Sequence, residues 1–311
     1  MTYGAPRDAA DVAGYLARVR GGKEPSPELV RELTSRYERI GWSPLIERTQ
    51  AQAAALEALL GDGWRVRAGM RFSAPSVGDA VTALGPVDRI VGIVMSPQFS
   101  PLLMSGYGAA LAEAAGISGV PTRLVEAWHR EPAFIDALAG LVRDALTEPG
   151  GRWHDAPGGR RGRSPRLVGP RLAVLFTAHS LPRRVFDAEP GYIAQLRETA
   201  ELVAARLGLA PERWRWAYQS AGHTQEEWLR PDLKELFPEI SATGAREVLV
   251  VPVQFLADHL EVLYDLDVAA AAEAEACGLR YRRIRMPNDD PAFIRSLADI
   301  ARGAVGAPSA V

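Results

Sequence analysis

The segment Leu175-Phe-Thr-Ala-His-Ser-Leu-Pro182 places one imidazole, that of His179, at the end of a short apolar run that Pro182 breaks. A short apolar run bounded by such a break is typical of a buried strand in a parallel sheet. A polar residue at the carboxyl end of a parallel strand points into the crevice where open α/β sheets bind ligands. We therefore predict an α/β fold with a site at His179.

A second apolar run, residues 248–253, leads into a predicted helix whose first turn carries Glu261. Both residues follow strands in the same half of the chain, so we expect His179 and Glu261 to share one site. Asp265 stands four positions after Glu261 on the same helical face, where two like charges repel unless a cation or a proton relieves them. One imidazole with carboxylate oxygens suits a divalent metal such as Fe(II), and it also suits proton removal near neutral pH.

Each of the two residues also has an ordinary structural interpretation. A lone histidine is more often a buried residue with satisfied hydrogen bonds than a ligand. The spacing of Asp258 and Glu261 matches a capping box, in which the glutamate completes the start of a helix. The prediction of chemistry therefore depends on the pairing of His179 with Glu261.

Short apolar runs alternate with longer amphipathic ones along the chain, which is the pattern of parallel sheets covered by helices. Ser26 followed by Pro27 predicts the start of one helix. The predicted strands are residues 64–71, 89–96, 122–128, 171–178, 214–219, 247–253 and 280–286, and the predicted helices include residues 26–37, 49–60, 132–146, 192–207 and 257–276.

Residues 148–170 are rich in Gly, Pro and Arg and lack an apolar period, so we interpret them as a linker between two α/β halves. The predicted organisation is an N-terminal α/β domain over residues 1–147, the linker, and a C-terminal α/β domain over residues 171–287. A C-terminal helix over residues 288–311 is expected to pack back on the N-terminal domain.

Composition excludes several classes of partner. The 36 Lys and Arg residues nearly balance the 38 Asp and Glu residues, so no overall field attracts nucleic acid or anionic lipid. The basic run Gly158-Gly-Arg-Arg-Gly-Arg163 lacks the interleaved aromatic residues that stack on bases, and we assign it to the solvated linker. Gly106-Tyr-Gly108 lacks the third glycine of a dinucleotide-binding loop, so we do not assign it to phosphate binding.

The single cysteine, Cys277, can form no internal disulfide and cannot supply the thiolates of an iron–sulfur cluster. We expect it to be a small core residue near the end of a helix. No apolar run approaches the about 20 residues needed to span a bilayer, and the N-terminus lacks an export pattern. We therefore expect a cytoplasmic protein with no transmembrane segment and no nucleic-acid partner.

An ordered set of short motifs runs through nearly the whole chain. They are Tyr3-Gly-Ala-Pro6, Val19-Arg-Gly-Gly22, Arg36-Tyr-Glu-Arg-Ile-Gly41, Ser43-Pro-Leu45, Ser96-Pro-Gln-Phe-Ser100, Ala178-His-Ser-Leu-Pro182, Tyr218-Gln-Ser220, Trp228-Leu229 and the block from Val251 to Asp265. With these motifs the chain resembles the ferrochelatases, which insert Fe(II) into a porphyrin. It is most similar to the bacterial enzymes that act on coproporphyrin III.

The resemblance implies two similar Rossmann-like halves, each a parallel sheet flanked by helices, with the active-site cleft between them. It also implies that His179 and Glu261 face each other across a macrocycle pocket and carry the metal insertion, which is a lyase reaction. A free porphyrin keeps two pyrrole N–H protons, so the reaction needs a proton acceptor and a weak metal ligand. His179 can take a proton or offer a lone pair to Fe(II), while Glu261 can offset the metal charge and relay protons to solvent. Which residue does which stays open.

The substrate follows from one position. The coproporphyrin enzymes of the family carry a tyrosine where this chain has Tyr3, whereas the protoporphyrin enzymes tend to carry a methionine. Coproporphyrin III has four propionates, which need polar and cationic partners. The residues that match the family's porphyrin-binding positions are Tyr3, Arg20, Arg36, Tyr37, Ser43 and Tyr107. Protoporphyrin IX is the alternative substrate.

Three positions depart from the family. Ala269 replaces a further carboxylate after Glu261, which disfavours a second, outer metal site, and Phe72 replaces a polar side chain that some relatives carry. Only Met1 and Thr2 precede Tyr3, where relatives have an apolar strand. If that strand is lacking, we expect Tyr3 to be poorly anchored and the neighbouring strands to be exposed.

Two rival functions and several partners follow from the same resemblance. A cobalt or nickel chelatase for another tetrapyrrole would share the fold, and a carrier of haem or porphyrin would bind without catalysis. For the ferrochelatase we expect Fe(II) as a substrate and no tightly bound cofactor. We also expect a monomer that makes transient contact with the next enzyme of the haem pathway.

Overall fold

The computed structural model describes residues 1–147, 171–222 and 226–306, so the predicted linker and its basic run lie outside the described residues. The chain divides into two compact units. Unit 1 comprises Met1–Ala133, Leu256–Leu260 and Asn288–Val311, and unit 2 comprises Phe134–Phe255 and Glu261–Pro287.

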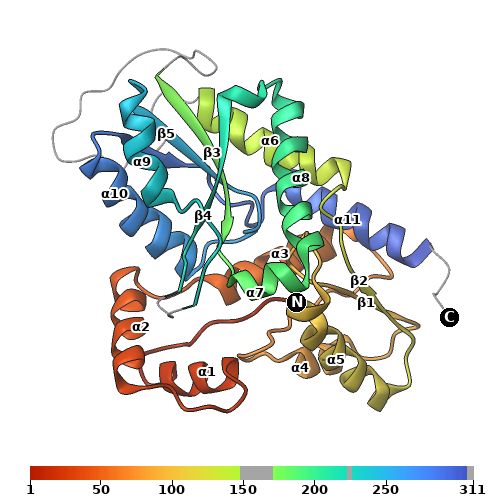
Figure 1. Cartoon of the computed structure of the whole chain (residues 1–311). Helices are drawn as coiled ribbons and strands as arrows, with labels where there is room; N and C mark the ends of the chain where they lie inside the picture. Colours follow the sequence, from red (N-terminus) through yellow and green to blue (C-terminus); the bar gives the residue numbers. More distant parts are fainter. Residues whose placement is uncertain (148–170, 223–225, 307–311) are drawn as a thin grey trace. The chain divides into compact units, whose positions relative to one another are not determined.

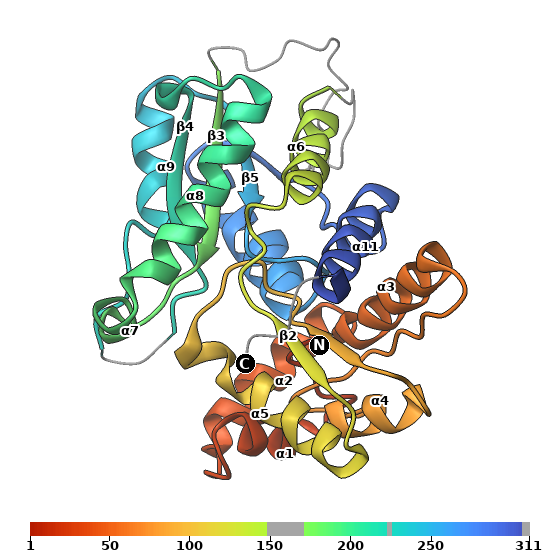
Figure 2. The same cartoon turned by 90° about the vertical axis from the view of Figure 1, so that its right-hand side faces the viewer.

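Unit 1 contains a short parallel sheet with helices around it, which are labelled in Figure 1 and seen from a second side in Figure 2. Ile90 is paired with Thr122 at the start of the two strands. Helix α5 contacts both strands, while α11, the C-terminal helix, contacts β1 and α3. The elements are α1 (Val12–Val19), α2 (Pro27–Arg39), α3 (Leu45–Leu60), α4 (Val77–Leu84), β1 (Ile90–Ile93), α5 (Pro101–Ser118), β2 (Thr122–Val125) and α11 (Pro291–Gly306).

The backbone of the first three residues forms hydrogen bonds with two segments, one on each side. Thr2 N–H donates to Gly69 O over 3.1 Å, and Arg71 N–H and Phe72 N–H donate to the carbonyls of Thr2 and Tyr3 over 2.9 and 3.0 Å. On the other side, Met95 N–H donates to Met1 O over 2.9 Å. The expectation that Tyr3 is poorly anchored is therefore wrong, because three residues are enough to pair with both neighbouring segments.

Unit 2 contains a four-stranded parallel sheet in the order β4-β3-β5-β6. This architecture confirms the predicted α/β class with parallel sheets flanked by helices. The elements are α6 (Pro132–Thr147), β3 (Leu172–His179), α7 (Arg183–Ala188), α8 (Pro190–Leu207), the 3-10 helix η1 (Pro211–Arg213), β4 (Trp214–Gln219), α9 (Leu233–Ala242), β5 (Glu247–Pro252), the π-helix η2 (Glu261–Ala270), α10 (Ala271–Ala276) and β6 (Arg280–Arg283).

The central strands of unit 2 are buried on both faces. Leu175 of β3 and Val250 of β5 share a core cluster with Phe237 of α9, Leu266 of η2 and Ala274 of α10. Figure 1 shows α6 and α8 on the other side of these strands from α9 and α10. Helices on both faces explain why β3 and β5 read as continuous apolar runs rather than alternating ones.

Helix α6 belongs to unit 2, whereas its position in the sequence placed it in the predicted N-terminal domain. Most of the apolar side chains of α6 are buried, and its polar partners also belong to unit 2. Asp136 of α6 pairs with Arg206 of α8, and Asp144 pairs with Arg285, which follows β6, over 3.6 Å. Neither partner can be identified from chain order.

Three local predictions have different outcomes. Ser26 caps α2 as expected, since its hydroxyl accepts from Leu29 N–H over 3.3 Å. The single helix predicted over residues 257–276 is instead a loop followed by η2 and then α10. The predicted strand over residues 64–71 is also wrong, because only Met70 forms bridges, to Thr2 and Ser76.

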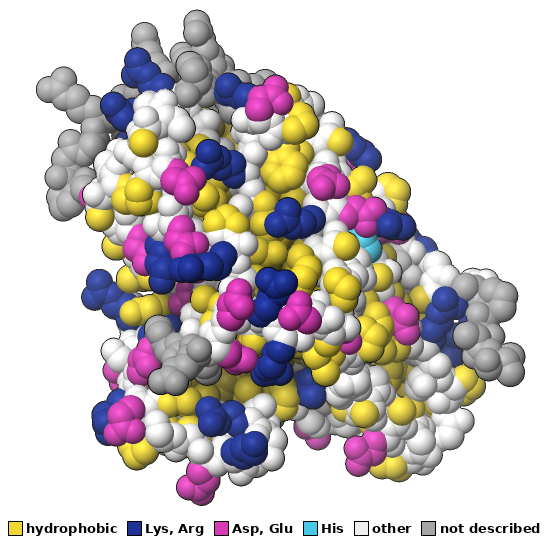
Figure 3. Space-filling model, in the orientation of Figure 1, with side chains coloured by type: hydrophobic (Ala, Val, Ile, Leu, Met, Phe, Trp, Pro, Cys, Tyr) yellow, Lys and Arg dark blue, Asp and Glu magenta, His cyan; other side chains and the backbone are white. Residues whose placement is uncertain are grey.

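The charge of the surface and the character of the helices relate to the predicted absence of nucleic-acid and membrane partners. Lys and Arg side chains are interspersed with Asp and Glu over the face drawn in Figure 3, in keeping with a formal net charge of −2. Within the described ranges, none of the helices combines the length and the apolar character that a membrane crossing requires.

Candidate functional site

His179 is the last residue of β3, and its side chain lies on the same face of the strand as Leu175 because side chains alternate along a strand. Leu175 packs in a cluster with Leu266 of η2. The alternation that buries Leu175 therefore directs the imidazole toward the side of the sheet that η2 covers.

The orientation of His179 is set by hydrogen bonds. Its backbone N–H donates to Gln254 Oε1 over 2.9 Å, and Gln254 Nε2 donates to the Tyr192 hydroxyl over 2.9 Å. The Nδ1 atom of the ring contacts the Ser180 carbonyl. Because a carbonyl oxygen can only accept, Nδ1 carries the proton in the neutral ring, and the lone pair is on Nε2.

The Nε2 atom of His179 lies 3.6 Å from Oε1 of Glu261, the first residue of η2. This separation exceeds the 2.7–3.2 Å of an ordinary N–H···O hydrogen bond. The two side chains are 23% and 39% exposed, so solvent reaches both. The structure therefore brings the two predicted residues together, with Nε2 of the imidazole facing the carboxylate.

The segment after His179 is held on two sides. Ser180 N–H donates to Gln219 O over 2.7 Å, and the Ser180 hydroxyl donates to Leu229 O over 2.9 Å. Leu229 N–H in turn donates to Leu181 O over 2.9 Å. The end of β3 is therefore tied to the end of β4 and to the segment before Pro231, which leaves little freedom for the imidazole.

Two other carboxylates, those of Asp265 and Asp258, lie close to Glu261 in the sequence. Asp265 lies within η2, four residues after Glu261. Asp258, the expected partner in a capping box, exchanges two hydrogen bonds with Asn288: its N–H donates to Asn288 Oδ1 over 3.0 Å, and Asn288 Nδ2 donates to its carboxylate over 2.8 Å. In the part of the chain that the structure describes, no three His, Cys, Asp or Glu residues are grouped as a metal site.

A second set of predicted residues gathers in unit 1. The rings of Tyr3 and Phe72 meet edge to face with centroids 4.6 Å apart. The Arg71 guanidinium lies 4.8 Å from the Phe72 ring centroid and 5.5 Å from that of Tyr107. Burial, and then the nearby Tyr3, raise the pKa of the Tyr107 phenol, while Arg71 opposes the rise. Tyr3 and Tyr107 thus share one aromatic cluster with Arg71 and Phe72.

Arg71 was not predicted from the sequence, and its partner Gly106 was considered only as part of a phosphate loop. Gly106 lies in α5, and a Cβ atom there would meet the guanidinium of Arg71. The glycine therefore makes room for the cation beside Tyr107. The available signal was a charged residue directly before Phe72 at the end of an extended segment.

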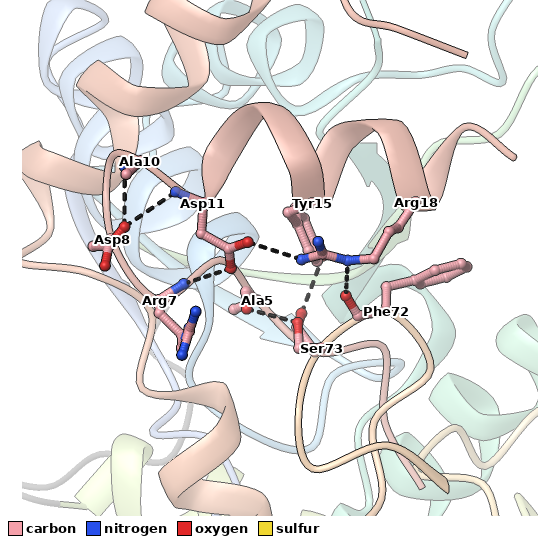
Figure 4. A network of polar contacts seen from close by, with 10 residues as sticks. Ala5, Arg7, Asp8, Ala10, Asp11, Tyr15, Arg18, Phe72 and Ser73 are labelled. Carbon is pink, nitrogen blue, oxygen red and sulfur yellow. Dashed lines mark hydrogen bonds and ion pairs between the residues drawn. The ribbon is translucent and has the colours of Figure 1, made fainter. Parts of the chain in front are cut away.

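A polar network anchors the chain on either side of Tyr3 and Phe72 (Figure 4). Arg18 Nε donates to Phe72 O over 2.7 Å, and its Nη2 donates to Asp11 Oδ1 over 3.0 Å. The other Asp11 oxygen accepts from Arg7 N–H over 3.2 Å, and Ser73 Oγ donates to Ala5 O over 2.7 Å. Helix α1 thereby links the segment after Tyr3 to the segment that carries Phe72.

The remaining predicted porphyrin contacts lie on or beside α1 and α2. Arg20 follows α1 and is exposed, and Arg36 pairs with Glu32 over 2.6 Å. Tyr37 is buried in a cluster with Val12 and Leu16 and stacks on Trp42. Ser43 is half-buried, and its hydroxyl accepts from Leu45 N–H over 3.4 Å. Tyr37 therefore has a packing role whatever else it contacts.

Comparison with known proteins gives a consistent result. The family model described as Ferrochelatase matches residues 1–305. The chain is 35% identical to "Ferrochelatase" of Deinococcus radiodurans, over 96% of this chain and 93% of the relative. It is 36% identical to "Coproporphyrin III ferrochelatase" of Halalkalibacterium halodurans, over 96% of this chain and 94% of the relative.

Solved structures support the fold. The protein SirB from Bacillus subtilis, solved with Fe3+, covers 83% of this chain and 90% of its own at a TM-score of 0.53 and 12% identity. The protein CbiX, described as the terminal enzyme of siroheme biosynthesis in denitrifying bacteria, covers 84% and 92% at a TM-score of 0.51 and 16% identity. At such identities the likeness concerns the fold alone.

Proposed function

The chain belongs to the ferrochelatase family, and on that premise we propose that it inserts Fe(II) into coproporphyrin III to give Fe-coproporphyrin in haem biosynthesis. The observation that carries the proposal is the 3.6 Å separation of His179 Nε2 and Glu261 Oε1. One side chain offers a nitrogen lone pair and the other a negative charge, which are the two groups that metal insertion requires on one face of the ring.

The reaction exchanges two protons for one metal ion. Fe(II) bonds to four pyrrole nitrogens, and the two N–H protons leave the macrocycle. We assign to His179 Nε2 the acceptance of a proton or a transient bond to the incoming ion, because Nδ1 is engaged with Ser180. Glu261 balances the charge of either the imidazolium or the ion, and its exposure allows protons to pass to solvent.

Tyr3 and the relatives both favour coproporphyrin III. The Halalkalibacterium halodurans relative and others from Geobacillus and Anoxybacillus flavithermus are named coproporphyrin III ferrochelatase, at 34–36% identity. Tyr3 is 42% exposed in spite of its contact with Phe72, so part of its side chain lies at the surface. A tyrosine at this position is what the resemblance associates with coproporphyrin.

We assign the macrocycle contacts to the aromatic cluster and the residues of α1 and α2. Propionates need cations and hydroxyl groups, which are supplied by Tyr3, Arg20, Arg36, Tyr37, Ser43 and Tyr107. Arg36 has its charge partly engaged by Glu32, so a propionate would compete with that carboxylate. For Tyr37 we assign only its edge, because the ring is buried.

The proposal extends to the cofactor, the location and the oligomeric state. No resident cofactor is assigned, since Fe(II) is a substrate and Cys277 is the single cysteine. A cytoplasmic location is supported by the same cysteine count, because no internal disulfide can form. We propose that the protein acts as a monomer and passes its product to the next enzyme of the pathway by transient contact.

Anaerobic assays of Fe(II) insertion with coproporphyrin III and protoporphyrin IX as competing substrates test the proposal. We expect the larger kcat/KM for coproporphyrin III. A larger value for protoporphyrin IX would contradict the substrate assignment. Binding of both porphyrins without any insertion would contradict catalysis and indicate a carrier.

A further inference from the structure

One ion pair of unit 2 joins the π-helix to the sheet. Arg283 of β6 meets Asp267 of η2 in a bidentate arrangement, with Nε–Oδ1 at 2.6 Å and Nη2–Oδ2 at 2.7 Å. The third nitrogen, Nη1, donates to Ile284 O over 2.8 Å. The side chains are only 12% and 17% exposed, unlike those of the other ion pairs in this sheet. Two parallel hydrogen bonds between a planar cation and a carboxylate fix both distance and direction.

The π-helix needs such a directional contact. A π-helix is rare and normally limited to a single turn, whereas η2 extends over ten residues, Glu261–Ala270. Its buried residues are Val262, Leu266 and Ala270, and Leu266 packs in the core cluster below the sheet. Apolar burial is non-directional, so it stabilises the helix against the sheet without choosing one rotation over a neighbouring one.

Asp267 follows the core residue Leu266 and therefore lies at the edge of the buried face. Tyr281 on β6 is buried beside the pair, and burial, then the charge of Asp267, raise the pKa of its phenol while Arg283 opposes the rise. A rotation of η2 would separate the carboxylate of Asp267 from the guanidinium. The same rotation would move Glu261, at the start of the helix, away from His179.

We infer that the Asp267–Arg283 pair is a positioning element of the metal-insertion site: it fixes the rotation of η2 and so holds the Glu261 carboxylate facing His179 Nε2. This inference depends on the proposed function, and it adds two residues that touch neither the metal nor the porphyrin. Both act through Glu261.

The Arg283→Lys variant tests the inference because it keeps the positive charge and removes the bidentate geometry. We expect kcat for Fe(II) insertion to fall about tenfold, since small misplacements of a catalytic group cost one to two orders of magnitude. The Kd for coproporphyrin III, from fluorescence quenching, should stay within about twofold, because no assigned porphyrin contact is altered. The matched control is Arg280→Lys, which weakens an ion pair between Arg280 and Glu247 on the neighbouring strand without touching η2.

A double-mutant cycle with Glu261→Gln separates positioning from general stability. If the pair acts through Glu261, then Arg283→Lys has no further effect on single-turnover insertion in the Glu261→Gln background. If the Glu261→Gln protein has no measurable turnover, the cycle cannot be completed. The test then depends on whether Arg283→Lys lowers kcat while the Kd for the porphyrin stays unchanged. If Arg283→Lys does not fold, as judged by circular dichroism, the same measurements are made with Asp267→Asn.

The inference is overturned if the kcat of Arg283→Lys stays within twofold of the wild type, or if the Arg280→Lys control loses as much kcat. It is also overturned if Arg283→Lys causes the same fractional loss of insertion rate in the Glu261→Gln background. Loss of the fold in both Arg283→Lys and Asp267→Asn would overturn it as well. Turnover by the wild-type enzyme is measured in the same assay. Its absence would count against the proposed function, whereas wild-type turnover with an unaffected Arg283→Lys variant would count against the positioning role alone.

Discussion

His179 Nε2 faces Glu261 Oε1 at 3.6 Å because a strand and a helix far apart in the chain each place one residue at the right end. The strand β3 ends on His179, and the helix η2 begins on Glu261. The Ser180 carbonyl engages Nδ1, so the unprotonated nitrogen faces the carboxylate. In the function that we propose, Nε2 accepts a proton or binds the metal ion, and the Glu261 carboxylate stabilises that positive charge.

Removing the charge of Glu261 should slow insertion without loosening the macrocycle. Glu261→Gln keeps the shape of the side chain and removes the negative charge, so we expect kcat to fall by about 100-fold, within the range for positioned acid–base groups. The Kd for coproporphyrin III should change by less than about twofold, because the hydrogen-bonding surface is nearly unchanged. Steady-state kinetics and fluorescence titration measure the two quantities.

Glu275→Gln in α10 is the matched control, because that carboxylate is exposed and lies in the helix that follows η2. The prediction fails if both variants slow insertion equally.

The network in Figure 4 should stabilise unit 1 in a measurable way. Arg18→Met keeps the aliphatic stem but removes the hydrogen bonds to Phe72 O and Asp11, of which Asp11 is only 16% exposed. We expect the free energy of unfolding to fall by about 1 kcal/mol, since Arg18 itself is nearly half exposed. Urea denaturation followed by circular dichroism measures this change.

The comparison is with Arg31→Met, which removes an ion pair to Glu28 in which both side chains are about 70% exposed. Exposed pairs contribute from zero to about 1 kcal/mol, and for this one we expect less than about 0.5 kcal/mol. Equal effects of the two substitutions would show that the network has no special role.

The stability of unit 2 should depend on pH through Glu273. The side chain of Glu273 reaches the surface, but its partial burial, and then the neighbouring Asp232, raise its pKa above the ordinary value. The folded state therefore binds this proton more tightly than the unfolded state, so ionisation of Glu273 costs stability above the folded pKa. That cost disappears as the pH falls through the folded pKa to the unfolded value of about 4.3.

We expect Glu273→Gln to be more stable than the wild type at pH 7 and equal to it below about pH 4. Urea unfolding at both pH values gives the two differences. A difference that is the same at both would contradict the cause assigned to the shift.

The strands of unit 2 could be predicted closely, and for β3 and β5 the reason is that a continuous apolar run leaves few alternatives. Trp214–Gln219 matches its prediction in full, and Leu172–His179 is shifted by one residue. His179 directly follows the predicted strand, which ended one residue too early, whereas Glu261 lay inside the predicted helix over residues 257–276 and in the structure begins η2. A polar residue at the end of a buried strand such as β3 can be predicted because the apolar run shows where the strand ends.

Other features depend on tertiary contacts that a sequence pattern does not contain. The four-residue spacing of Val262, Leu266 and Ala270 is compatible with an α-helix as well as a π-helix, so η2 could not be distinguished from α10. The pairing of Met1–Tyr3 on both sides needs only three residues, which is too short for a periodic signal. Arg71 is recognisable only once Gly106 lies beside it.

The most direct test of the account is anaerobic Fe(II) insertion by His179→Ala, measured together with coproporphyrin III binding. The account predicts a loss of turnover of at least about 100-fold, because both the lone pair and the proton acceptor are removed, while porphyrin binding stays within about twofold. Turnover of His179→Ala within twofold of the wild type would contradict the central role of the His179–Glu261 pair.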